Sequence, residues 1–268
     1  MKINFMSLGS GSSGNCSYLW TDTYGILIDA GVGIRNIKKF FKDMALDINK
    51  VIAILVTHDH ADHIKAVGNL SNTLNIPVYT TREVHKGMER SYCMTKKLSE
   101  ENKKFILKEE SFMLRDFKIT CFEVPHDGTD NVGYNLVFDN KVFTFITDIG
   151  HITPTASRYI DCANYLILEA NYDHNMLMAG RYPEYLKQRI YGDHGHLCND
   201  ELASYMAGHY SPSMKYLWLC HLSNDNNTPE LARRTVESAL REKNINPDEC
   251  LKIIPLRRVL PSDIYTFD

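Results

Sequence analysis

The sequence predicts an α/β protein with two mixed β-sheets packed face to face and helices on the outside. Strand-like apolar runs alternate with segments of helical periodicity along the 268 residues, which is typical of such a fold. Histidines and aspartates directly follow several of these runs, and strand ends are rigid enough to hold distant ligands on one small site. We therefore expect a single domain over residues 1–268, with a functional site at one edge of the sandwich.

The first part of the chain is expected to begin with a strand meander over Ile3–Leu8, Tyr18–Thr21 and Ile26–Asp29. Ile34–Phe41 has its apolar residues on one helical face, and Val51–Val56 is apolar throughout, as in a buried strand. The pattern then predicts a helix ended before Pro77, a short strand and another helix, over His63–Leu74, Val78–Thr80 and Arg82–Arg90.

The second part of the chain is expected to begin with four strands over Phe112–Arg115, Lys118–Val124, Tyr134–Phe138 and Lys141–Thr147. The pair Asp139-Asn140 is typical of a hairpin turn between the last two. Thr228 before Pro229 is a favourable helix start, so a helix is expected from there to the neighbourhood of Arg241. Two more helices are expected over Pro183–Ile190 and Asp200–Gly208. Three more strands are expected over Tyr165–Leu168, Tyr216–Cys220 and Leu251–Ile254.

Three histidines and two aspartates follow the strand Val51–Val56 in the segment His58-Asp59-His60-Ala61-Asp62-His63. Imidazole nitrogens and carboxylate oxygens are ligands that zinc, iron and manganese prefer. His58 and His60 lie on one side of an extended turn, whereas Asp62 and His63 follow where a helix can start. The spacing therefore predicts a site that can serve two ions, which together can activate a water and bind an oxyanion.

Three further candidate ligands follow later strands: His126, Asp148 and His221. A single histidine after a strand is more often structural, so each residue alone is weak evidence. Their shared position at strand ends, in combination with the His58–His63 segment, is what indicates a metal site.

Composition excludes several classes of protein. A hydrophobic content of 44%, a charged content of 24% and a net charge of −3 fit a globular enzyme and argue against a basic DNA-coating protein. No apolar stretch approaches the ~20 residues of a membrane span, and the N-terminal apolar piece is too short for a signal peptide. Seven cysteines without a close pairing pattern indicate reduced thiols and a cytoplasmic location.

Further motifs are Gly9-Ser10-Gly11-Ser12-Ser13-Gly14-Asn15, Glu169-Ala170-Asn171-Tyr172-Asp173 and Gly195-His196-Leu197-Cys198-Asn199. Consecutive amides and hydroxyls in the first motif can cradle a phosphate, although a flexible surface loop has the same composition. A histidine with an orienting carboxylate is a good general acid near neutral pH, so His196 and Glu169 are candidates for that pair. They are equally compatible with a helix-start histidine and a solvated strand-end carboxylate.

Together, the motifs Ser-Gly-Ser-Ser-Gly-Asn, His-Asp-His-x-Asp-His, Glu-Ala-Asn-Tyr-Asp and Gly-His-Leu-x-Asn resemble the YycJ/WalJ-type family of bacterial metallo-β-lactamase-fold proteins. The resemblance is nearly full length and implies the four-layer αββα sandwich of the metallo-β-lactamase fold. It also implies a binuclear metal-dependent hydrolase of phosphodiester bonds, a 5′→3′ DNA exonuclease that binds DNA by its 5′ end and acts in DNA repair or replication-linked processing. Cys198 departs from the serine expected there, and no long inserted domain lies between Asp173 and His196.

The resemblance also implies roles for individual residues. One metal is expected on His58, His60 and His126 and another on Asp62, His63 and His221, with Asp148 bridging two divalent ions, Zn, Mn or Fe. Asp62 is also counted as catalytic, together with His196, which protonates the leaving oxygen, and Glu169, which assists it. Asp29 is expected to orient the His58–His63 loop, although it could equally be a helix cap. The expected substrate-binding residues are Ser12, Ser13, Asn15 and Asn199.

Other functions are also compatible with this sequence. The main alternative is a small-molecule hydrolase, either a cyclic phosphodiesterase or a glyoxalase-type thioesterase, which has no need for His196 and Glu169. A non-catalytic scaffold stabilised by metal is another, but the complete set of water-activating ligands argues against it. DNA needs positive surface, which Arg82, Lys86 and Arg90 provide on one helical face, although a solvated helix face has the same pattern.

Overall fold

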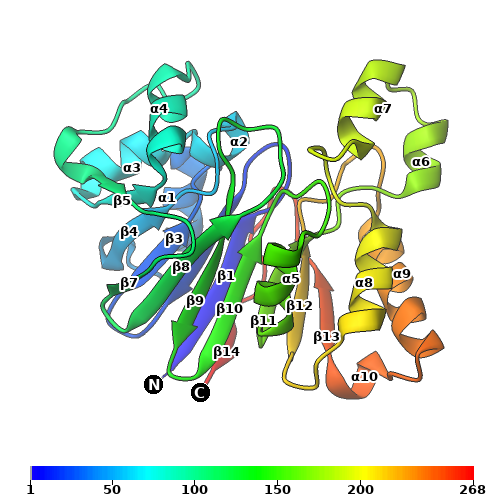
Figure 1. The fold of residues 1–268 in the computed structure, drawn as a ribbon. Helices are drawn as coiled ribbons and strands as arrows, with labels where there is room; N and C mark the ends of the chain where they lie inside the picture. The colour runs from blue at the N-terminus through cyan, green and yellow to red at the C-terminus, as the bar shows by residue number, and fades with distance from the viewer. Residues whose placement is uncertain (1) are drawn as a thin grey trace. The chain divides into compact units, whose positions relative to one another are not determined.

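The computed structural model describes residues 2–268, which form two compact units. The first unit contains the chain up to Leu107 with Gly128–Asp130 and Arg257–Asp268, and the second contains Lys108–Asp127 and Asn131–Leu256. Each unit is built on its own mixed β-sheet with helices beside it (Figure 1). The predicted α/β class, with two mixed sheets and flanking helices, is therefore confirmed. The expectation of a single domain over residues 1–268 stays a prediction.

The sheet of the first unit contains seven strands of the described chain in the order β14, β1, β2, β3, β4, β5, β6. Their bounds are β1 Ile3–Gly9, β2 Cys16–Trp20, β3 Gly25–Ile28, β4 Val51–Leu55, β5 Val78–Thr80, β6 Lys103–Phe105 and β14 Tyr265–Phe267. Pairing is antiparallel from β14 to β3 and parallel from β3 to β6. Because β3 and β4 are parallel, their carboxyl ends reach the same edge, and Asp29 and His58 follow there.

The helices of the first unit are α1 Ile34–Asp43, α2 Ala61–Ile64, α3 Val67–Leu74 and α4 Arg82–Arg90, with short 3-10 turns at Ile48–Lys50 and Glu100–Asn102. The expectation of one continuous helix over His63–Leu74 was wrong, because α2 and α3 are separate. The N–H of Ala66 donates to the carbonyl of Ala30 at 2.8 Å instead of continuing the helix. This hydrogen bond joins the chain just after the His58–His63 segment to the chain after β3.

The sheet of the second unit has seven described strands in the order β13, β12, β11, β10, β9, β8, β7. Their bounds are β7 Ser111–Leu114, β8 Phe117–Glu123, β9 Val132–Phe138, β10 Lys141–Ile146, β11 Tyr165–Glu169, β12 Tyr216–Cys220 and β13 Lys252–Pro255. Pairing is antiparallel from β7 to β10 and parallel from β10 to β13. Asp139 and Asn140 have φ values of 47° and 63°, which confirms the predicted tight hairpin turn.

The helices of the second unit are α5 Pro154–Asp161, α6 His174–Ala179, α7 Glu184–Tyr191, α8 Asn199–His209, α9 Pro229–Glu242 and α10 Pro247–Cys250. Helices α8 and α9 lie side by side (Figure 1). Apolar side chains from α5, α8 and α9, such as Ala156, Leu202 and Val236, share a buried core with β11 and β12. No helix within residues 2–268 is long and apolar enough to cross a membrane.

Candidate metal centre

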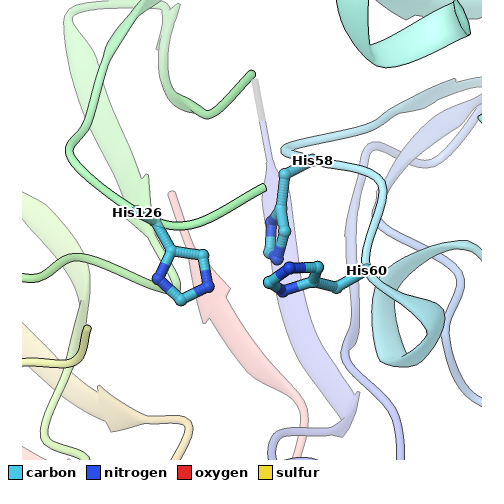
Figure 2. A group of neighbouring side chains, drawn as sticks. All are labelled: His58, His60 and His126. Carbon is cyan, nitrogen blue, oxygen red and sulfur yellow. The ribbon is translucent and has the colours of Figure 1, made fainter. Parts of the chain in front are cut away.

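The loop after β4 brings three imidazoles of the first unit into one small volume. The ring centroid of His58 lies 4.0 Å from that of His63 and 4.6 Å from that of His60. Figure 2 shows His58 and His60 on this loop, where His60 directly precedes α2. His58 and His63 are almost completely buried, whereas Asp62 and His60 are partly exposed. This arrangement presents the ligand types that the sequence predicted, with a route for solvent to reach them.

The carboxylate of Asp29 holds this loop in place from the end of β3. It accepts hydrogen bonds from the main-chain N–H of Thr57 at 2.8 Å, the Thr57 hydroxyl at 2.9 Å and Nδ1 of His63 at 2.7 Å. Asp29 has a φ of 58°, a backbone conformation uncommon for residues other than glycine. Because Nδ1 of His63 faces a carboxylate, it carries the proton, and Nε2 of the same ring keeps its lone pair.

Asn15 connects the Gly/Ser loop to the His58–His63 segment. Its main-chain N–H donates to the Asp62 carbonyl at 2.7 Å, and its side-chain Nδ2 donates to Oδ2 of Asp62 at 3.1 Å. The same Nδ2 lies 2.9 Å from Nε2 of His63. Asn15 is buried, whereas Ser12 and Ser13 are exposed. Of the three loop residues predicted to bind substrate, Asn15 is thus the one that touches the candidate ligands, and the two serines face solvent.

The second unit contributes His126, Asp148 and His221, which are all buried and follow β8, β10 and β12. His126, drawn in Figure 2, bonds through Nδ1 to the carbonyl of Gly195 at 2.8 Å. Burial lowers the pKa of His126 and keeps the imidazole neutral, although Asp148 opposes this shift. A neutral imidazole is the form that binds a metal. His221 has a φ of 52°, so the chain turns sharply at this residue.

A compact cluster in the second unit joins Asp148 and His221 to Glu169 and His196. One possible ligand atom of each lies within 4.8 Å of those of the others. Oε1 of Glu169 is 2.7 Å from Nδ1 of His196 and 2.8 Å from Nδ1 of His221. Oε2 of Glu169 accepts from the main-chain N–H groups of Ile149 at 2.9 Å and Leu197 at 3.1 Å. Glu169 is therefore a fully buried carboxylate that orients two histidines at once.

The electrostatics of the cluster favour a charged pair of a protonated His196 and an ionised Glu169. Burial opposes protonation of His196, but the negative charge and hydrogen bond of Glu169 outweigh it and raise the pKa of this imidazole. Burial likewise opposes ionisation of Glu169, and the positive charge of His196 together with the two imidazole hydrogen bonds lowers the pKa of the carboxyl. The His196 side chain is 20% exposed, so its ring can meet a ligand from solvent.

Three buried asparagines support the turn at His221. Nδ2 of Asn171 donates to the His221 carbonyl at 2.8 Å, and Nδ2 of Asn227 donates to the carbonyls of Ala170 and Asn171 at 2.9 and 3.1 Å. Asn199 exchanges side-chain hydrogen bonds of 2.9 Å with Asn227 and is completely buried. The structure thus places Asn199 inside this network, and its predicted contact with substrate stays a prediction.

Comparison with known proteins identifies the family. The profile of the beta-lactamase superfamily domain matches residues 24–218. The exodeoxyribonuclease YycJ of Bacillus anthracis is 35% identical over 264 residues, which are 98% of this chain and 99% of that protein. The exodeoxyribonuclease WalJ of Streptococcus pneumoniae serotype 2 is 34% identical over 244 residues, which are 91% of this chain and 90% of that protein. The chain belongs to the beta-lactamase superfamily, in the branch of these two relatives.

The fold of this beta-lactamase superfamily member agrees with solved structures. The metallo-beta-lactamase fold protein YhfI from Bacillus subtilis matches it with a TM-score of 0.71 at 14% identity, over 100% of both chains. The Zn²⁺-bound PqqB from Methylobacterium extorquens matches with a TM-score of 0.69 at 14% identity, over 97% of this chain and 99% of that one. The protein therefore has the metallo-β-lactamase fold, and its family membership makes it a metal-dependent hydrolase.

The donor chemistry of this superfamily member fits a divalent ion. The first unit offers the imidazoles of His58, His60 and His63 beside the Asp62 carboxylate, and the second unit offers its own imidazoles and carboxylates. Nδ1 of His63 bonds to a carboxylate and Nδ1 of His126 to a carbonyl, so both rings present an unprotonated Nε2. Oxygen partners on the far nitrogen are the usual surroundings of metal-ligating histidines.

Two features of this superfamily member were not anticipated from its sequence. The contact between Glu169 and His221 has no local signal, because the residues lie 52 positions apart, at the end of β11 and directly after β12. Cys198, where serine was expected, caps α8 with its sulfur, which accepts from the N–H of Glu201 at 3.4 Å. A serine hydroxyl would make the same kind of cap, so the substitution preserves the helix start that follows His196.

Proposed function

We propose that this protein is a 5′→3′ DNA exonuclease that cleaves phosphodiester bonds with the help of two divalent metal ions. The observation that carries the proposal is the buried Glu169 with His196 at 2.7 Å, within the cluster that contains Asp148. A thioesterase has no need for this pair, because a thiolate leaves without a proton donor. The exodeoxyribonuclease relatives, similar over nearly the full chain, support DNA as the substrate.

The proposed ligand sets are those implied by the sequence motifs. His58, His60 and His126 would hold one ion, Asp62, His63 and His221 the other, and Asp148 would bridge them. The buried, hydrogen-bonded state of these imidazoles and carboxylates supports the assignment. Bound there, zinc, manganese or iron would supply Lewis acidity and an activated water. Asp29 positions the set by orienting His63, and Glu169 positions it by orienting His221.

His196 is proposed as the general acid. Its Nδ1–H is held by Glu169, so in the imidazolium form the Nε2–H is the proton that can be given away. Donation to the departing 3′ oxygen leaves a neutral imidazole, and the released nucleotide carries a 3′-hydroxyl. The raised pKa of His196 supports this role, because the shift increases the fraction of the charged form near neutral pH.

The substrate-binding residues proposed for this reaction are on the Gly/Ser loop. Ser12 and Ser13 would contact a DNA phosphate, and Asn15 would position Asp62 and His63 beside it. Asn199, predicted to bind substrate, would act through Asn227 on the segment that carries His221. DNA repair or replication-linked processing in the cytoplasm is the proposed context.

The test compares two substrate classes with the same metal-loaded protein. We expect kcat/KM on single-stranded DNA in Mn²⁺ to exceed kcat/KM on a thioester such as lactoylglutathione. Glu169 and His196 should matter for the DNA reaction, because its leaving alkoxide needs a proton. Faster turnover of the thioester would reject the nuclease in favour of the glyoxalase-type alternative.

A further inference from the structure

We infer that the Gly/Ser loop over Ser10–Asn15 and the side chain of Lys65 form a binding site for the terminal 5′-phosphate of a DNA strand. The inference rests on the proposed nuclease function and specifies which end the enzyme selects and which groups select it. Every residue concerned belongs to the first unit. The loop amides were noted in the sequence as a possible phosphate cradle, whereas Lys65 belongs to none of the sequence motifs.

The loop is hydrogen-bonded to the His58–His63 segment. The N–H of Asn15 donates to the Asp62 carbonyl at 2.7 Å, and the N–H of Gly31 donates to the Asn15 carbonyl at 2.8 Å. A Cβ on Gly14 would lie 2.8 Å from the carbonyl oxygen of Gly31, so the two backbones are in close contact. A ligand on this loop would therefore meet a pre-formed surface directly beside the candidate metal ligand Asp62.

The tip of the loop offers hydrogen-bond donors. The N–H of Gly14 donates to the Gly11 carbonyl at 2.8 Å, which closes a tight turn with Ser12 and Ser13 at its centre. Within residues 2–268, the main-chain N–H groups and hydroxyls of Ser12 and Ser13 donate no hydrogen bond, and both residues are exposed. Successive N–H groups in a turn form an anion-binding concavity, which two hydroxyl donors extend.

Lys65 adds a positive charge to the same concavity. Its Nζ donates to the Ser13 carbonyl at 3.3 Å, and its ammonium has three N–H groups, so two more can reach a ligand. Lys65 forms no ion pair within the described part of the chain, and its side chain is exposed. Arg258 packs against the loop at Gly11. A Cβ added to Gly11 would lie 3.5 Å from the Cβ and Cγ atoms of Arg258.

The donor set matches a terminal phosphate better than an internal one. A phosphomonoester carries about −1.5 to −2 charges and three oxygens that accept hydrogen bonds. An internal phosphodiester carries a single charge and two such oxygens. Two amides, two hydroxyls and an ammonium can satisfy the three oxygens of a terminal phosphate. Because the loop lies beside Asp62, it sets the distance from the 5′ end of the DNA to the first bond cleaved.

The experiment measures end preference with the metal-loaded, full-length protein. Single-stranded DNA of one sequence is prepared with a 5′-phosphate or a 5′-hydroxyl, and kcat/KM is measured for each in Mn²⁺. Binding of the same two oligonucleotides, made with phosphorothioate linkages, is followed by fluorescence anisotropy. The variants are Lys65→Met and Lys65→Arg, and the matched control is Lys38→Met, an exposed lysine on α1 of the same unit.

We expect the wild-type protein to prefer the 5′-phosphate in both assays. Lys65→Met should reduce that preference by about ten- to hundredfold, the range for one hydrogen bond to a charged group. Lys65→Arg should restore much of the preference, and Lys38→Met should leave it unchanged. DNA cleavage without end preference, or a preference that survives in Lys65→Met, would overturn the inference while the nuclease stands. If no DNA is cleaved, the nuclease fails, and the anisotropy ratios still decide whether the phosphate site exists.

Discussion

Substitution of Glu169 by glutamine tests how one buried carboxylate serves two histidines. Oε2 of Glu169 accepts two main-chain N–H bonds, and a glutamine carbonyl oxygen can keep both of them. The glutamine NH₂ group then takes the place of Oε1, opposite Nδ1 of His196 and Nδ1 of His221. Because NH₂ is a donor, each Nδ1 must accept, which moves the imidazole proton to Nε2.

The magnitude follows from these two contacts. A hydrogen bond to a charged group contributes about 1.5–3 kcal/mol and a neutral one about 1 kcal/mol, so the two bonds together weaken by about 1–4 kcal/mol. A proton on Nε2 of His221 blocks its proposed bond to a metal, and loss of an orienting group typically lowers metal affinity or activity by about 10–100-fold. Loss of the Glu169 charge also lowers the pKa of His196, which depletes the acid form. We expect kcat on DNA to fall by about 100-fold or more.

The assay combines calorimetric titration with Mn²⁺, kcat on 5′-phosphorylated DNA, and urea unfolding to show that the variant is folded. The matched control is Glu109→Gln in the same unit, because Glu109 is exposed and bonds to Arg158 and Tyr159, which are not members of the cluster. Metal affinity and kcat at wild-type levels in Glu169→Gln would refute the reasoning. A loss of kcat with unchanged metal affinity would show that Glu169 acts on the proton donor His196 and not on metal binding by His221.

Three other substitutions test separate parts of the site. His196→Ala should keep the metals and reduce kcat on DNA by about 10²–10⁴-fold. The loss should be smaller on a p-nitrophenyl phosphodiester, because its leaving group needs no proton. Equal losses on both substrates would indicate that His196 binds phosphate instead. Asp29→Ala removes the partner of Nδ1 of His63, so we expect metal affinity, measured by titration, to fall about 10–100-fold; unchanged affinity would contradict the orienting role. Gly31→Ala places a Cβ 1.5 Å from the Asp62 carbonyl and should lower the free energy of unfolding by about 3 kcal/mol or more, whereas Gly33→Ala meets nothing within 4 Å and should be nearly neutral. Similar urea midpoints for the two glycine variants would contradict that difference.

The sequence predicted the positions of the candidate ligands well where these residues directly follow strands. Parallel strands end at a common edge, so Asp29 after β3 and His58 after β4 could be located from apolar runs alone. The same rule located Asp148 and His221 after β10 and β12. The pairing of Glu169 with His221 could not be predicted, because it depends on the register between β11 and β12 and on the sharp turn at His221.

The elements that were missed are short or carry weak periodicity. The edge strands β6 and β14 have three residues each, too few for an alternating pattern to appear. Helix α5 had a usable signal, since Thr153 before Pro154 repeats the Thr228-Pro229 pair that predicted α9. The break between α2 and α3 could not be seen in the sequence, because it depends on the hydrogen bond from Ala66 to Ala30 across the unit.

The most direct test of the proposed metal-dependent 5′→3′ DNA exonuclease activity is the order in which nucleotides leave an end-labelled strand. Protein freed of metal and then titrated with Mn²⁺ is given single-stranded DNA labelled at the 5′ end or at the 3′ end. We predict that activity saturates at two metal equivalents per chain, that the 5′ label appears at once as a mononucleotide, and that the 3′ label shortens as a ladder. Release of the 3′ label first, saturation at one equivalent, or no cleavage at any metal loading would contradict the account.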